Sequence, residues 1–134
     1  MSDGKRSSKS GCSRMSEFLL DTSYLIDLVY ADDDAVALHE EIGGMAATAT
    51  PCLYELAKFV ESDLEELFAA REVLSLTPSD ATEAGRVYRE HHDAGDLLGE
   101  MDTLISGVAR SRDLTLVTRD DDFKRVSDLD CRYY

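Results

Sequence analysis

Residues 17–30 read EFLLDTSYLIDLVY, and this stretch decides the fold class. It opens with a short apolar run that ends at Asp21, which is typical of a buried strand. Apolar residues then recur at helical spacing, which predicts a helix over 22–30. A short strand that leads directly into a helix is the first unit of an α/β domain.

The same alternation of short strands and helices continues toward the C-terminus. Further strands are predicted over residues 45–50, 73–76, 114–118 and 130–134. Further helices are predicted over 32–42, from Pro51 to about 60, and over 62–70, 79–94, 99–112 and 120–126. This order predicts an α/β fold with a mostly parallel sheet of four or five strands and helices on both faces.

Local residue types mark several helix ends. Asp32 and the two acids after it suit a helix N-terminus, because acidic side chains meet the positive end of the helix dipole. The pair Gly43-Gly44 is expected to end that helix. We expect Ser79 or Asp80 to cap the helix over 79–94 and Gly95 to end it.

The domain is expected to span residues 17–134. Residues 1–16 are rich in Ser, Gly and Lys without apolar periodicity, which predicts a disordered N-terminal tail. The chain holds no apolar run of the ~18 to 20 residues that a membrane span needs. It also lacks a signal peptide pattern, so we expect a cytoplasmic protein. The three cysteines show no paired spacing and are expected to be free thiols; the three histidines are expected at the surface.

Charge is the unusual feature of the composition. The chain carries 14 basic and 28 acidic side chains, with a net charge of −14. Such a field repels nucleic acid at low salt. Two explanations keep a nucleic-acid substrate open, and we favour both together. An acidic surface of halophilic type serves solubility where high salt screens charge, and some carboxylates bind a metal ion.

Four acids that are far apart in the sequence are predicted to meet at one edge of the sheet. Asp21 follows the first strand and Asp120 follows the strand over 114–118, while Glu55 and Asp102 lie in the first turns of two helices. In open α/β sheets, ligands bind outside the carboxyl ends of the strands. We therefore expect a site built from these four carboxylates.

A divalent cation would balance these acids. Asp21 and Asp102 lie between apolar neighbours, with no Lys or Arg within three residues. Partly buried carboxylates repel one another and raise each other's pKa unless a cation joins them. Oxygen ligands without nearby Cys or His favour Mg²⁺, with Mn²⁺ also suitable. The alternative is that each acid caps a helix or pairs with a distant Arg.

These segments resemble the PIN-domain nucleases, most closely the VapC-type toxins of toxin–antitoxin pairs. The matching segments are LLDTS at 19–23, YEL at 54–56, MDTLI at 101–105 and VTRDDDF at 117–123. The resemblance covers about residues 17–130, and it implies that the predicted 17–134 unit is a PIN-like nuclease domain. It implies a ribonuclease that hydrolyses RNA phosphodiester bonds with Mg²⁺ or Mn²⁺.

The resemblance also assigns roles to the acids. Asp21 and Asp102 are similar to the principal metal ligands, and Glu55 to a third acid that binds the metal directly or through water. Asp120 resembles the fourth position. Because three acids precede Phe123, Asp122 is a further candidate that shares or replaces the role of Asp120.

Other residues near these motifs are secondary candidates. Thr118 matches a polar position whose hydroxyl orients an acid or a phosphate. Arg119, Lys124 and Arg125 are candidates for gripping phosphate, and pairing with the surrounding acids is an equal alternative. Glu100 lies two residues before Asp102 and is a weaker candidate for the site.

A VapC-type protein implies two protein partners. It is expected to form a homodimer and to bind a small antitoxin, whose Arg or Lys would enter the acid site. The helices around residues 25–30 and 53–59 would supply the apolar patch for such a partner. Two other classes remain: a catalytically inactive PIN-like domain that binds protein or RNA, and a receiver-like phosphoacceptor domain. The second needs an Asp where Glu55 stands and a Lys after a later strand, and the sequence offers neither.

Overall fold

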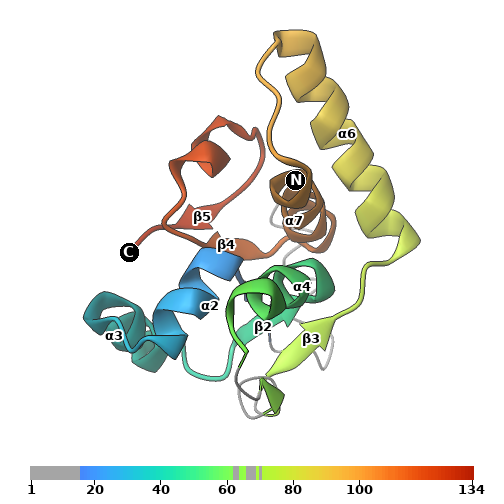
Figure 1. Cartoon of the computed structure of the whole chain (residues 1–134). Coiled ribbons are helices and arrows are strands. Elements are labelled where there is room, and N and C mark those ends of the chain that lie inside the picture. The colour runs from blue at the N-terminus through green and yellow to red at the C-terminus, as the bar shows by residue number, and fades with distance from the viewer. Residues whose placement is uncertain (1–15, 62–63, 66–68, 70) are drawn as a thin grey trace.

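The computed structural model describes residues 16–61, 64–65, 69 and 71–134. Its strands are β1 (Phe18–Leu20), β2 (Ala46–Ala49), β3 (Glu72–Leu74), β4 (Thr115–Val117) and β5 (Cys131–Arg132). Its helices are α2 (Thr22–Val29), α3 (Asp33–Ile42), α4 (Thr50–Phe59), α6 (Pro78–Ala94) and α7 (Glu100–Arg112), with a 3₁₀ turn η1 (Asp121–Arg125). Figure 1 shows this order from blue to red.

The sheet has five strands in the order β3-β2-β1-β4-β5, and every pair is parallel. The predicted α/β class with a mostly parallel sheet is therefore confirmed. β1 is the central strand, and Leu19 lies opposite Ala47 on one side and Leu116 on the other. The carboxyl ends of β1, β2 and β4 consequently lie side by side.

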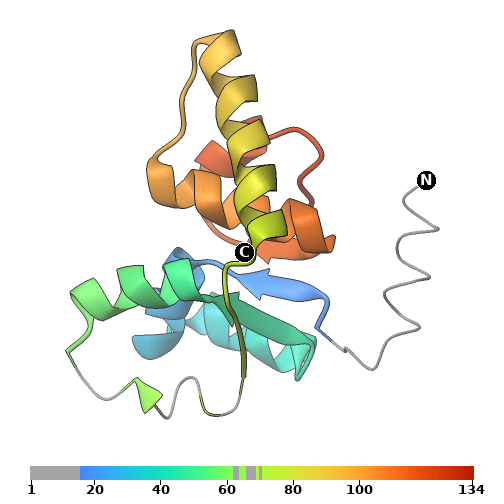
Figure 2. The same cartoon turned by 90° about the vertical axis from the view of Figure 1, so that its right-hand side faces the viewer.

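Helices cover both faces of the sheet. The connections from β1 to β2 and from β2 to β3 run in one direction along the sheet, and the connection from β3 to β4 runs back. Because parallel crossovers are right-handed in nearly all proteins, connections in opposite directions cover opposite faces. Figure 2 shows α6 and α7 above the strands, and α2 and α3 below them.

The main core lies between the sheet and these helices. Leu19, Leu116 and Val117 of the strands are fully buried against Leu56 of α4 and Ile105 of α7. A smaller apolar cluster contains Val87 of α6, Leu98 of the segment between α6 and α7, and Val126, which follows η1. Within the described ranges, no helix is both long and apolar enough to cross a membrane.

Two helix-start predictions have different outcomes. Asp32 caps α3 as expected, since its side chain accepts from the Ala35 amide over 3.1 Å. The cap of α6 is Thr77, so the prediction of Ser79 or Asp80 is wrong. Thr77 Oγ1 accepts from the Asp80 amide over 3.2 Å, and Asp80 Oδ2 accepts from the Thr77 amide over 2.9 Å. This reciprocal capping box starts the helix at Pro78.

The prediction of surface histidines is wrong for His91. Its side chain is buried, and its Nδ1 lies 3.2 Å from Asp96 Oδ1. His39 is half-buried and His92 is exposed. The predicted helix over 62–70 lies largely outside the described residues. The same holds for the predicted tail, of which only residue 16 is described, so both stay predictions.

A close contact between α6 and α7 yields a testable prediction. A Cβ added at Gly107 of α7 would lie 2.6 Å from both the Cβ and the backbone nitrogen of Ala84 in α6. We expect Gly107→Ala to destabilise the fold, because α6 must move to admit the methyl group. Overpacking of this kind costs about 1–3 kcal/mol.

Gly85→Ala is the matched control for this substitution. Gly85 also lies inside a helix, and the closest neighbour of an added Cβ is the flexible Arg89 side chain at 3.8 Å. Alanine there should stabilise the protein by roughly 0.5–1 kcal/mol. Both substitutions gain the helix propensity of alanine, so the difference between their unfolding free energies in urea reports the steric cost at Gly107. Equal unfolding free energies would contradict the close α6–α7 contact.

Candidate metal site

Asp21 lies at the centre of the carboxyl edge of the sheet. Its backbone amide donates to Val117 O over 3.0 Å, and the residue then becomes the N-cap position of α2. Its side chain is only 4% exposed. The buried runs of β1 and β4 thus place a carboxylate where water is largely excluded.

Two hydroxyl groups hold the Asp21 carboxylate. Thr118 Oγ1 donates to Asp21 Oδ2 over 2.6 Å, and Ser23 Oγ donates to the same oxygen over 3.0 Å. Burial raises the pKa of Asp21, and repulsion from Glu55 adds to that shift. The hydrogen bonds from Thr118, the Thr22 backbone and Ser23 act in the opposite direction. Thr118 was expected to orient an acid, whereas the sequence reasoning missed Ser23.

Glu55 reaches the same region from α4. Its Oε1 accepts a hydrogen bond from Thr22 Oγ1 over 2.8 Å, which ties α4 to the start of α2. Repulsion from Glu55 contributes to the raised pKa of both Asp21 and Asp102. Thr22 was also missed, although it lies inside the LLDTS segment directly after Asp21.

Asp102, Asp120 and Asp122 form the tightest acid group in the described part of the chain. One carboxylate oxygen from each lies within 4.8 Å of the others. Asp102 stands in the first turn of α7, and Asp120 caps η1 by accepting from the Asp122 amide over 2.9 Å. The Asp120 amide donates to Thr118 Oγ1 over 3.0 Å, which links this group to Asp21.

The electrostatics of Asp102 report how close the acids are. Burial raises its pKa to about 7, and repulsion from Asp21, Asp120, Glu55 and Asp122 adds to the effect. The ion pairs among the described residues leave Asp21, Asp102 and Asp120 without a cationic partner. The five predicted site residues are therefore brought together as a charge-unbalanced cluster.

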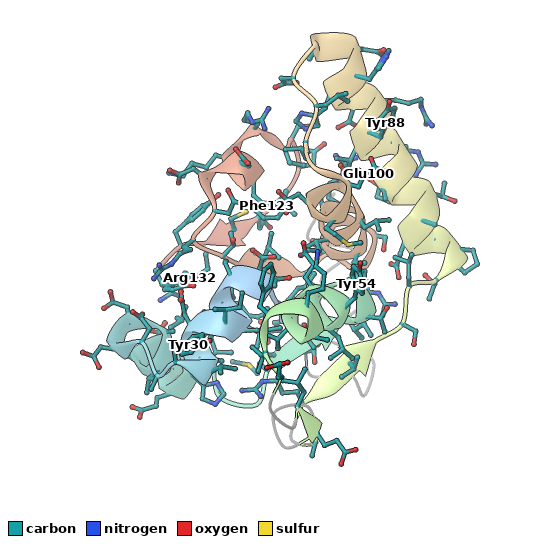
Figure 3. The ribbon with its side chains drawn as sticks, in the orientation of Figure 1. Tyr30, Tyr54, Tyr88, Glu100, Phe123 and Arg132 are labelled. Carbon is teal, nitrogen blue, oxygen red and sulfur yellow. The ribbon has the colours of Figure 1, made fainter. Side chains whose placement is uncertain are left out.

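The donor set fits a hard divalent cation. All candidate ligand atoms are carboxylate oxygens, which suit Mg²⁺ and Mn²⁺. The free cysteines Cys52 and Cys131 are absent from the three-acid group. Phe123, labelled in Figure 3, is 1% exposed and anchors η1 in the core, so the chain holds Asp120 and Asp122 against α7.

The nearby cations are engaged by carboxylates. Arg119 Nε lies 2.9 Å from Asp27 Oδ2, and Lys124 Nζ lies 3.1 Å from Asp121 Oδ1. Arg125 contacts Asp96 Oδ2 at 3.4 Å and Asp122 Oδ1 at 3.6 Å. This geometry agrees with the expected alternative of pairing with acids. The side chain of Glu100 is exposed at the start of α7.

The predicted apolar patch on α2 and α4 is divided between core and surface. Leu25 and Leu56 are buried in the core. Tyr30 is 71% exposed, Tyr54 55% and Phe59 65%. Figure 3 shows Tyr30 and Tyr54 well apart, on different helices. The exposed aromatic groups therefore form two separate surfaces.

The fold and the acids together define a class: α/β domains with carboxylates clustered at the carboxyl edge of a parallel sheet. The family model of the PIN domain matches residues 18–129. The chain belongs to the PIN domain family. The search of curated proteins finds no match.

Solved structures of VapC toxins in VapBC complexes share this fold. The chain is similar to VapBC from Salmonella typhimurium bound to DNA, with a TM-score of 0.80, 23% identity, and coverage of 89% of this chain and 98% of that one. It is also similar to VapBC2 from Rickettsia felis bound to a promoter DNA fragment, with a TM-score of 0.79 and 21% identity. That match covers 87% of this chain and 98% of the other. A third similar structure is VapBC-5, a toxin–antitoxin system from Mycobacterium tuberculosis, with a TM-score of 0.67 and 26% identity. That match covers 87% of this chain and 97% of the other.

Proposed function

We propose that this chain is a metal-dependent ribonuclease that serves as the toxin of a type II toxin–antitoxin system. The observation that carries the proposal is the acid cluster: Asp102, Asp120 and Asp122 lie within 4.8 Å of one another. Buried Asp21 and half-buried Glu55 flank this group and add to its repulsion. Membership of the PIN domain family supports the same chemistry.

In this proposal, Asp21 and Asp102 are the principal ligands of Mg²⁺ or Mn²⁺. Glu55, Asp120 and Asp122 complete the set. The ion, when bound, supplies a water of lowered pKa and offsets charge on the scissile phosphate. Hydrolysis adds water across the phosphodiester bond and leaves a 5′-phosphate and a 3′-hydroxyl.

The protein's own part is to hold the ligands in place. Ser23 and Thr118 hold Asp21 through its Oδ2, and Thr118 also accepts from the backbone of Asp120. The hydroxyl of Thr118 therefore couples Asp21, which follows β1, to Asp120, which caps η1. Thr22 orients Glu55 in the same way. These hydrogen bonds hold the carboxylates in a fixed orientation before the cation and the substrate bind.

The toxin role brings an antitoxin partner, a homodimer and a cytoplasmic location into the proposal. The related structures from Salmonella typhimurium and Rickettsia felis are VapBC complexes. An uncompensated acid cluster is well suited to receive an Arg or Lys of a partner, which would silence the enzyme while paired. Exposed Tyr30, at the end of α2, is the place at which to look for such a partner.

The competing function is a catalytically inactive PIN-like domain that binds protein or RNA. All the acids are present, and this favours the enzyme. Titration calorimetry with Mn²⁺ separates the two functions. The enzyme should bind Mn²⁺ in the wild type and lose that binding in Asp21→Asn, whereas the inactive module would show no site that depends on Asp21.

Metal removal tests the enzyme directly. We expect the purified chain to cleave single-stranded RNA at high salt with Mg²⁺ or Mn²⁺, to stop in EDTA, and to recover when excess Mn²⁺ is added. High salt matters because the net charge of −14 otherwise repels the substrate. Gel analysis of 5′-labelled RNA measures the rate and the product ends. Cleavage that continues in EDTA would end this proposal.

A further inference from the structure

A cation and two aromatic rings share an exposed surface of α4. We call Tyr54, Lys58 and Phe59 the α4 patch. The rings of Tyr54 and Phe59 are 55% and 65% exposed. Lys58 Nζ lies 5.2 Å from the centroid of the Tyr54 ring and 5.7 Å from that of Phe59. The patch therefore presents flat apolar faces around one positive charge.

Most cations in the described part of the chain pair with a carboxylate, whereas Lys58, like Arg89 of α6, has no described carboxylate as an ion-pair partner. The ion-paired cations of the described part are Arg86, Arg110, Arg112, Arg119, Lys124, Arg125 and Arg132. Lys58 forms no ion pair with any described residue, although acids outnumber bases two to one. An available ammonium group on an acidic protein marks a place where an anion is tolerated.

The patch lies next to the acid cluster along the same helix. Tyr54 directly precedes Glu55, and Lys58 and Phe59 follow Glu55 by three and four residues. That spacing is about one helical turn, or roughly 5 Å along the axis. When a phosphate of an RNA chain lies at the acid cluster, the neighbouring nucleotides of that RNA can therefore reach the α4 patch.

We propose that the α4 patch binds unpaired nucleotides of the RNA beside the scissile phosphate, an inference that rests on the proposed ribonuclease function. Tyr54 and Phe59 stack on bases, and Lys58 contacts a backbone phosphate. The acidic surface repels the backbone, so affinity must come largely from stacking, which salt does not screen. Bases within a duplex keep their faces covered, and the patch therefore selects single strands.

The test measures binding without cleavage. The probe is a fluorescein-labelled single-stranded RNA dodecamer of mixed sequence, and the same strand annealed to its complement is the duplex probe. Anisotropy is followed in EDTA and about 1 M KCl, where the Debye length is about 3 Å. We expect the wild-type chain to prefer the single strand. Tyr54→Ala and Phe59→Ala should each weaken that binding by about 5- to 50-fold.

Lys58→Met should change the salt dependence instead. Loss of one phosphate contact lowers the slope of log K against log salt by about 0.7 for a single strand. Matched controls come from α6, where Tyr88 is 41% exposed and the next residue, Arg89, is also exposed. Tyr88→Ala and Arg89→Met remove the same kinds of group far along a different helix. Both should bind like the wild type.

Several outcomes overturn the inference. They are unchanged binding by the α4 variants, a preference for the duplex, or no binding by the wild type. Sedimentation of each variant adds another: a shift in oligomeric state with RNA binding intact would make the patch an interface between copies of the chain. Patch-dependent binding without any cleavage would contradict the nuclease proposal alone, and cleavage with patch-independent binding would contradict this inference alone.

Discussion

Asp102→Asn is expected to abolish RNA cleavage while the fold stays intact. Asp102 is repelled by four other carboxylates, those of Asp21, Asp120, Glu55 and Asp122. A cation bound at Asp102 would therefore offset this electrostatic repulsion. Asparagine keeps the shape and removes one negative ligand. We expect a loss of about 1000-fold in rate, which corresponds to ~4 kcal/mol. Single-turnover cleavage of labelled RNA with saturating Mn²⁺ measures it.

Asp121→Asn is the matched control for this experiment. Asp121 belongs to the same acidic run as Asp120 and Asp122, but its side chain is 81% exposed and pairs with Lys124. It lies outside the three-acid group, so its removal should change the rate by less than about threefold. Asp21→Asn should resemble Asp102→Asn. If Asp102→Asn cleaved as fast as Asp121→Asn, the acids would have no catalytic part.

The second large effect is a linkage between pH, metal and stability. The pKa of Asp102 is raised from 3.8 to about 7 in the folded protein. Stability from the protonated form is therefore fully present below pH ~4 and is lost as the pH rises through ~7. The metal-free protein should unfold more easily at pH 8 than at pH 5. Asp80 does not contribute to the stability change between pH 5 and pH 8, because its pKa is lowered to about 2.

Mn²⁺ should reverse the loss at pH 8. Binding at a hundred times the dissociation constant adds about 2.7 kcal/mol. For a domain of this size that raises Tm by roughly 10 °C. Asp102→Asn should be the more stable protein without metal at pH 8 and should gain little from Mn²⁺. Calorimetric scans of both proteins at the two pH values measure this, and a wild type whose Tm ignores both pH and Mn²⁺ would refute the linkage.

Much of the fold could be predicted because its signals are local. The apolar run at 17–20 and the β-branched run at 114–118 predict strands, and strands that alternate with helices have few stable arrangements. Errors arose where a tertiary contact decided the outcome. His91 looks like a surface residue in a polar helix, yet its side chain is buried and its Nδ1 lies 3.2 Å from Asp96 Oδ1. No local pattern reports such a contact.

The candidate site shows the same division. The four separated acids could be placed at one sheet edge, because parallel strands end together. From the sequence, Asp120 was placed in the fourth position with Asp122 as a further candidate, and the choice between the two stayed open. The cap geometry of η1 turns Asp120 and Asp122 toward Asp102 and leaves Asp121 exposed beside Lys124. Ser23 and Thr22 were missed because their partners, Asp21 and Glu55, are fixed by backbone direction and by the contact between α2 and α4.

By itself, the sequence determined the strand and helix order, the parallel sheet and the set of acids, because apolar periodicity and the carboxyl-edge rule need no knowledge of distant contacts. Only the tertiary structure decided which carboxylates lie within 4.8 Å, which hydroxyls hold them, and which cations are already paired. Those distances depend on how side chains from distant segments pack together, and electrostatic energies change steeply over a few ångströms.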